Sequence, residues 1–215
     1  MKAPVAWVLA SLIATPAALD AQGDTVRATA TVVGTVEVDG FASRWATAVY
    51  AESQSAGPPT PGSPVIMDQH GLRFRPSVVA VPVGATVVFR NGDPVVHNIF
   101  SPGLLGAANA EGGSFDLGRF FPGTEARHRA EGAGVLLILC RLHPEMAAYV
   151  VVAPTRAVTV TDSMGRFVLT GLPPGPATLR FWHPLRAPAT IRVDLEPGRT
   201  SVVNIRLPRL PVTSR

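Results

Sequence analysis

Short runs of apolar and β-branched residues follow one another along almost the whole chain of 215 residues, separated by glycine, proline, aspartate or asparagine. Such runs between turn signals are typical of β-strands, and helix is hard to place beyond the segment 103–113, which is more typical of an ordered loop. With 47% hydrophobic residues, the pattern predicts an all-β protein with packed cores, built as sandwiches or barrels. The predicted strands are 28–38, 45–50, 65–67, 77–81, 86–89, 135–139, 149–152, 158–161, 167–169, 178–182, 190–195 and 201–207.

Residues 1–21 have the pattern of a secretory signal peptide. Lys2 precedes an apolar run over 5–14, and mostly small residues follow up to Ala21. That run is too short for a membrane span, which needs about 20 apolar residues, and no later run reaches this length. We therefore expect an exported protein, periplasmic or otherwise extracytoplasmic, with no transmembrane segment after cleavage. A retained N-terminal anchoring helix is the alternative.

The net charge of +4 comes almost wholly from arginine, because Lys2 is the only lysine. The arginines are scattered singly, without the basic runs and interleaved aromatic residues that follow a nucleic-acid backbone. The charge pattern therefore argues against nucleic acid as a partner. It is consistent with solubility or with the steering of an acidic partner.

The segment 140–146 places a thiol, an imidazole and a thioether at C-x2-H-x2-M spacing, in Cys140, His143 and Met146. Two histidines, a cysteine and a long axial methionine make the blue-copper arrangement. One alternative is a buried structural cysteine, because a free thiol packs like a small hydrophobe. Another is a zinc site with Glu145 in place of Met146, since structural zinc normally collects four strong N, S or O donors. The residue types favour copper.

Export gives the single cysteine added meaning. Cys140 has no cysteine partner in the chain and cannot form an internal disulfide, so in an oxidising compartment it is an idle thiol or is committed to another role. Metal binding holds the sulfur as a thiolate and shields it from oxidation. Metal ligation is therefore the expected role.

His97 is the best candidate for the second imidazole, because it ends an apolar run that follows the turn at 91–94. Val135–Leu139 is the most apolar run after the predicted signal, so we expect a strand buried on both faces that delivers Cys140 to a rigid position. His70 and His128 are interpreted as exposed surface residues, and His183 as a strand-end residue packed beside Trp182.

Residues 62–153 resemble a cupredoxin, closest in ligand-loop length to amicyanin and pseudoazurin, through the motifs 74–76, 81–93, 97–98 and 134–146. The resemblance implies a Greek-key β-sandwich with one mononuclear type 1 copper ion at one end. It implies that His97, Cys140 and His143 are the equatorial ligands and that Met146 is the axial one. By the same resemblance, Asn98 ties the two ligand loops together by hydrogen bonds near the sulfur.

Residues 154–209 resemble the later strands of a carboxypeptidase regulatory-like (transthyretin-like) β-sandwich, whose opening strands are missing there. Residues 25–52 look like that opening, and a linker rich in proline, glycine and serine follows at 52–64. We therefore expect the cupredoxin domain to be inserted into a second, small sandwich, since domain termini usually lie close together. In the alternative, the N-terminal strands join the cupredoxin sheet and residues after 153 form an appendage.

Together these patterns predict a protein that carries single electrons, with a redox protein as its partner, such as a cytochrome c or a dehydrogenase. Leu142 and Pro144 beside His143 would supply an apolar docking rim, or would simply pack the loop. The alternatives are a copper-delivery or sequestering protein and a non-catalytic surface-interaction protein. An enzyme is not expected, because the four ligands fill a mononuclear site, and no Ser-His-Asp set, paired carboxylates or phosphate-cradling loop appears.

Overall fold

The computed structural model describes residues 29–52, 63–105 and 113–210. The predicted signal peptide, most of the predicted linker and most of the segment 103–113 lie outside these residues. The described chain forms sixteen β-strands and one short 3-10 turn, η1 (Gly40–Arg44), so the prediction of an all-β fold is confirmed. Within those ranges, no helix has the length and apolar character needed to cross a membrane.

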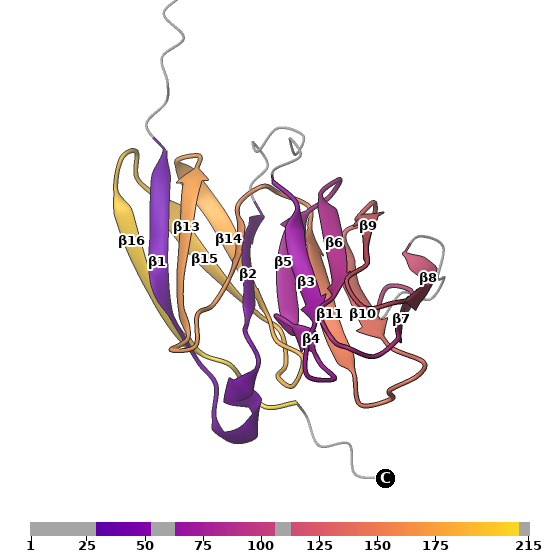
Figure 1. The fold of residues 1–215 in the computed structure, drawn as a ribbon. Coiled ribbons are helices and arrows are strands. Elements are labelled where there is room, and N and C mark those ends of the chain that lie inside the picture. The colour runs from indigo at the N-terminus through magenta and orange to yellow at the C-terminus, as the bar shows by residue number, and fades with distance from the viewer. Residues whose placement is uncertain (1–28, 53–62, 106–112, 211–215) are drawn as a thin grey trace, which may run out of the picture.

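The strands form four sheets that stack as successive layers (Figure 1). The first layer has the order β13-β1-β16 and the second β12-β2-β14-β15. The third has the order β5-β11-β10-β7-β8 and the fourth β4-β3-β6-β9. The bounds are β1 (Ala30–Glu37), β2 (Ala48–Glu52), β3 (Val65–Gln69), β4 (Phe74–Arg75), β5 (Val78–Pro82), β6 (Thr86–Asn91), β7 (His97–Pro102), β8 (Ser114–Phe120), β9 (Glu125–Arg129), β10 (Gly134–Leu139), β11 (Ala147–Ala153), β12 (Val158–Val160), β13 (Arg166–Leu172), β14 (Gly175–Trp182), β15 (Ala189–Leu195) and β16 (Thr200–Arg206).

The first two layers combine strands from both ends of the chain. β1 lies between β13 and β16, antiparallel to the first and parallel to the second. β2 lies between β12 and β14 and is antiparallel to both. Alternate side chains of the two sheets share one core, in which Val32 and Phe167 meet Val49, Leu179 and Phe181. Strands before residue 53 and after residue 157 therefore form one sandwich, which we call the outer sandwich.

Layers three and four form a second sandwich from the residues between those segments, which we call the inner sandwich. Its core is apolar and fully buried, with Met67 and Phe89 facing Ile99, Leu136 and Ile138. The parallel pairs β5–β11 and β3–β6 bring segments distant in sequence together. This packed core fixes the ends of the strands, and therefore the starting points of the loops at one end of the sandwich.

A third apolar cluster joins the two sandwiches. Ala48, Tyr50 and Trp182 of the outer sandwich pack against β5, β10 and β11 of the inner one. Burial along β10 alternates: Leu136 and Ile138 are buried in the inner core, whereas Val135 is only partly buried under the outer sandwich. We predicted that β10 is buried on both faces. This was only partly right, because the face toward the outer sandwich is partly exposed.

His183 fixes the end of β14 to the turn η1, and it gives the fold a pH dependence. Its ring is buried, donates from Nε2 to the carbonyl of Ala42 (3.0 Å) and accepts at Nδ1 from the amide of Leu185 (3.0 Å). Burial lowers the pKa of His183, and the nearby charge of Arg186 adds to this. Between its folded-state pKa and the unfolded value of about 6.5, the unfolded chain binds more protons. The contribution of neutral His183 to the free energy of unfolding is therefore fully present above about pH 6.5. It is lost as the pH falls through the lower folded-state pKa.

We expect His183→Gln to lessen the loss of stability between neutral and mildly acidic pH, because glutamine does not titrate. Urea unfolding of metal-free protein at a series of pH values measures this. His70→Gln is the control, since His70 is exposed. If the free energy of unfolding of His183→Gln depended on pH as that of the wild type does, His183 would not be the source of this pH dependence.

Candidate metal centre

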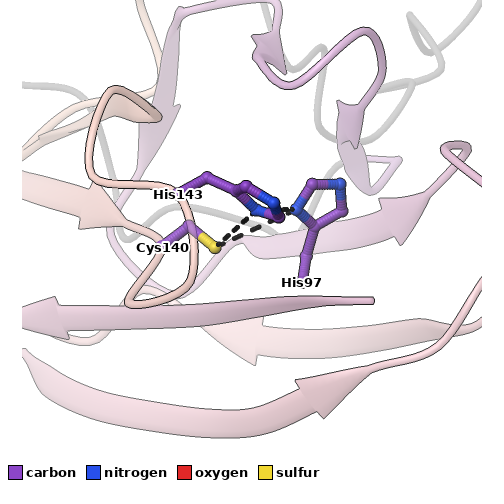
Figure 2. A group of neighbouring side chains, drawn as sticks. All are labelled: His97, Cys140 and His143. Atoms are coloured by element: carbon purple, nitrogen blue, oxygen red, sulfur yellow. Dashed lines mark hydrogen bonds between the residues drawn. The ribbon is translucent and has the colours of Figure 1, made fainter. Parts of the chain in front are cut away.

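Three side chains from two segments converge at one end of the inner sandwich, as Figure 2 shows. Nδ1 of His97 lies 3.0 Å from Nδ1 of His143, and Sγ of Cys140 lies 3.9 and 3.8 Å from these two atoms. His97 and Cys140 are buried and His143 is partly exposed. The described residues therefore present one sulfur and two nitrogen donors around a common point.

Strand pairing brings these donors together. His97 is the first residue of β7, and Cys140 directly follows β10. β7 and β10 are antiparallel neighbours, with Leu139 opposite Phe100, so the start of one strand lies near the end of the other. His143 lies on the connection from β10 to β11. The separation of 43 residues between His97 and Cys140 is closed by this pairing.

Met146 ends the same connection, immediately before β11. Its amide donates to the carbonyl of His143 (2.9 Å), which closes a tight turn in the loop. Its side chain is 1% exposed and belongs to the same core cluster as Cys140. The loop from β10 to β11 thus carries Cys140, His143 and Met146 in a folded, partly buried form.

Asp93 orients His97, and the sequence did not reveal this role. Its Oδ2 lies 2.9 Å from Nε2 of His97, and the carboxylate also accepts hydrogen bonds from the amides of Gly71 (2.6 Å) and Leu72 (3.0 Å). Burial raises the pKa of Asp93, but these hydrogen bonds outweigh it and hold the pKa below the usual range. An ionised carboxylate only accepts, so Nε2 carries the ring proton and Nδ1 presents its lone pair to the cluster.

Asn98 links the two segments that carry the cluster. Its amide N–H donates to Sγ of Cys140 (3.4 Å), and its Oδ1 accepts from the amide of Arg141 (3.3 Å). Its Nδ2 donates to Asp116 (2.8 Å) and to the carbonyl of Gly118 (2.9 Å). A hydrogen bond to sulfur stabilises the thiolate, and the remaining bonds hold the amide in place.

Asp116 is the second carboxylate that the sequence did not reveal. Hydrogen bonds from Gly118, then from Asn98 and Arg141, lower the pKa of Asp116 and keep it ionised. The guanidinium of Arg141 lies 3.3 Å from this carboxylate and 3.9 Å from the centre of the Phe100 ring. Arg141, which directly follows Cys140, is therefore held against β7 through Phe100 and against β8 through Asp116.

The chemistry of the donor set fits copper. Sulfur and imidazole donors suit copper, whereas calcium and magnesium take oxygen ligands. No carboxylate belongs to the cluster in the described residues, and Asp93 faces the opposite side of the His97 ring.

Three solved structures are similar to part of this chain. A purple cupredoxin from Nitrosopumilus maritimus is 25% identical and covers 41% of this chain and 99% of its own, with a TM-score of 0.34. A reduced mutant of amicyanin is 20% identical and covers 48% of this chain and 97% of its own, with a TM-score of 0.37. A copper-containing nitrite reductase from Thermus scotoductus is 22% identical and covers 55% of this chain and 28% of its own, also with a TM-score of 0.37. None of the curated protein sequences matches the chain.

Residues 144–208 match the family model of the carboxypeptidase regulatory-like domain, which confirms the second resemblance. In the structure, the first ten matched residues run through the end of the ligand loop and β11, which pairs with β5 and β10 of the inner sandwich. The remaining matched strands lie in the outer sandwich. The family match and the strand pairing therefore assign β11 differently.

The other histidines lie outside the cluster of His97, Cys140 and His143. His70 is exposed, and His183 is buried in the outer sandwich. His128 was predicted to be an exposed surface residue, which was wrong: it is half-buried and stacks on Phe115 at 3.9 Å between ring centres. Burial lowers the pKa of His128, as expected for a ring packed against an aromatic face.

Asp93→Asn is expected to lower the affinity for copper by about 10 to 100-fold, because the amide no longer fixes the His97 tautomer as a carboxylate does. Competition with a chromogenic Cu(I) chelator measures the affinity. Asp68→Asn is the matched control, since Asp68 accepts from the neighbouring amide of Gly92 (3.1 Å) and contacts no residue of the cluster in the structure. Equal affinities for the two variants would show that Asp93 has no positioning role.

Proposed function

We propose that this chain is an exported type 1 copper protein that carries single electrons between redox proteins. The observation that carries the proposal is the convergence of Sγ of Cys140 with Nδ1 of His97 and of His143 at one buried point. His97, Cys140 and His143 would be the equatorial ligands of one copper ion, and Met146 the axial ligand. Copper supplies reversible exchange of one electron.

The chain's own contribution is rigidity. A carrier is fast when its ligands move little between oxidation states, and here each ligand segment is anchored separately. Asp93 holds His97, Asn98 binds the sulfur of Cys140, and the Met146 amide closes the loop onto His143. The contacts of Asp93 and of the Met146 amide involve groups other than the donor atoms, whereas the Asn98 amide donates to the sulfur itself and stabilises the thiolate.

The partly exposed His143 would be the exit for the electron. Leu142 is 47% exposed beside it, and Pro144 is also exposed. An apolar rim around an imidazole edge favours brief docking of another redox protein, a cytochrome c or a dehydrogenase, without strong binding. No catalytic step is part of the proposal, because four ligands from the chain leave no position for a substrate.

Export and the domain arrangement belong to the same proposal. The apolar run at 5–14 supports a signal peptide ending near residue 21, and therefore a periplasmic or other extracytoplasmic location. The pairing of β1 with β13 and β16, and of β2 with β12 and β14, supports a cupredoxin domain over 62–153 inserted between residues 25–52 and 154–209 of the outer sandwich.

Copper titration with visible spectroscopy and voltammetry tests the function. We expect one equivalent of Cu(II) to give an intense thiolate-to-copper band and a reversible one-electron wave with the metal retained. A colourless Cu(II) protein would contradict the type 1 site. Loss of the ion at each reduction would instead support copper delivery.

A further inference from the structure

A cavity of about 600 Å³ lies where the outer sandwich, the loop between β3 and β4, and the loop between β10 and β11 meet. Arg44 and Trp45 line it from the outer sandwich, Leu72 to Arg75 from the β3–β4 region, and Glu145 to Ala147 from the loop between β10 and β11. Ligand pockets commonly have volumes of about 300 to 1,000 Å³ and occur between domains. The cavity therefore has the size and the location of a small-molecule site.

Positive charge dominates its wall. Three guanidinium groups, those of Arg44, Arg73 and Arg75, line the cavity against one carboxylate, that of Glu145. In the described part of the chain, Arg73 and Arg75 form no ion pair, whereas Arg90, Arg141 and Arg180 each pair with a carboxylate. Guanidinium groups bind carboxylate and phosphate oxygens through paired hydrogen bonds. Trp45, which is partly exposed, and Leu72, which is exposed, supply apolar wall for the rest of a ligand.

We propose that this cavity binds a small organic anion, with its carboxylate or phosphate group held by Arg73 and Arg75 and its apolar body against Trp45. The concave shape favours a small molecule over a flat protein surface. A single carboxylate in the wall still leaves an excess of positive charge for a singly or doubly charged ligand.

The occupant would contact one segment of the candidate copper site directly and would reach the other through Leu72 and Asp93. Met146 lines the cavity directly. Leu72 also lines it, and its backbone is left-handed with φ of 56°, next to Gly71 with φ of 64°. Both amides donate to Asp93, which holds His97. A non-glycine residue in this conformation is held there by its surroundings, here by Asp93. This link to the copper centre rests on the proposed function, whereas the anion site itself does not.

Calorimetry on the metal-free full chain tests the site, with benzoate and phenyl phosphate as probes and sodium chloride used to equalise ionic strength. We expect one saturable event for at least one probe, and the preferred probe identifies the carboxylate or phosphate source. Arg73→Gln and Arg75→Gln should each weaken binding about tenfold or more, because each removes a charged hydrogen-bond donor. Arg192→Gln is the matched control, since Arg192 is exposed on β15 and lies outside the cavity.

Absence of saturable heat with both probes, or an equal loss in Arg192→Gln, would overturn the proposal. Binding of a hexaglutamate peptide more tightly than either probe would also overturn it, by identifying an acidic protein as the occupant. In copper-loaded protein, the bound probe should shift the midpoint potential of the wild type but not of the Arg73→Gln/Arg75→Gln double variant. An unchanged potential despite binding would reject the link to the copper centre, and a protein that holds no redox-active copper would reject the proposed function without affecting the anion site.

Discussion

Cys140→Ser should abolish the intense visible band of the copper-loaded protein and lower its copper affinity by several orders of magnitude. The band arises from the thiolate, and the serine hydroxyl neither ionises at neutral pH nor offers a soft donor. Sγ of Cys140 is the one donor that lies within 4 Å of both imidazole Nδ1 atoms in the described cluster. Visible absorption and copper titration of the variant measure both effects.

The fold should survive this change. Serine is close to cysteine in size, and a single buried hydroxyl costs about 1 to 3 kcal/mol. Circular dichroism and thermal unfolding without metal therefore separate loss of the site from loss of structure. Replacing His143 by alanine should also remove the band, whereas His70→Ala should leave it unchanged because His70 is exposed and outside the cluster. Colour that persists in Cys140→Ser would refute the assigned ligand set.

Gly34→Ala should destabilise the outer sandwich by roughly 3 kcal/mol or more, because added volume between packed strands forces the backbone apart. Gly34 lies in β1, and a Cβ at this position would overlap the carbonyl oxygen of Val203 in β16 and meet the Phe167 ring at 3.0 Å. The first obstacle is backbone, so no side-chain rotation relieves it. Urea unfolding followed by far-ultraviolet circular dichroism measures the loss.

Gly132→Ala is the matched control for this prediction. A Cβ there meets only the Leu104 side chain at 3.6 Å, which is ordinary contact, so its unfolding midpoint should stay close to that of the wild type. The copper band of Gly34→Ala reports on the inner sandwich at the same time. If Gly34→Ala unfolds at the wild-type urea concentration, the close pairing of β1 and β16 does not contribute as the structure implies.

Local sequence patterns predicted those parts of the molecule that depend on neighbours in the chain. The spacing of Cys140, His143 and Met146 is carried by one short loop, so the sequence shows it directly. The long apolar run before Cys140 likewise identified β10. The sequence indicated His97 as a candidate because it ends an apolar run, and strand pairing brings it near the sulfur of Cys140.

Features that depend on tertiary contacts were missed. β8 and β9 were not predicted, because their mostly exposed residues include few in apolar runs and their place in the sheets is decided by β7 and β6. Asp93 gave only the weak signal of an aspartate four residues before His97 in a turn. Its role depends on the left-handed backbone of Gly71 and Leu72, which residue types alone do not fix.

The two sandwiches are joined where β2 leads out of the outer one and β12 leads back in, and these two strands are hydrogen-bonded to each other, with Val158 opposite Tyr50. A single flexible linker would let the inner sandwich rotate relative to the outer one. Two adjacent crossings, together with the apolar contact of Tyr149 with Trp182, remove that freedom. The position and orientation of His143 relative to the outer sandwich are then fixed. A partner that held the outer sandwich would therefore also set the direction in which the candidate metal centre faces.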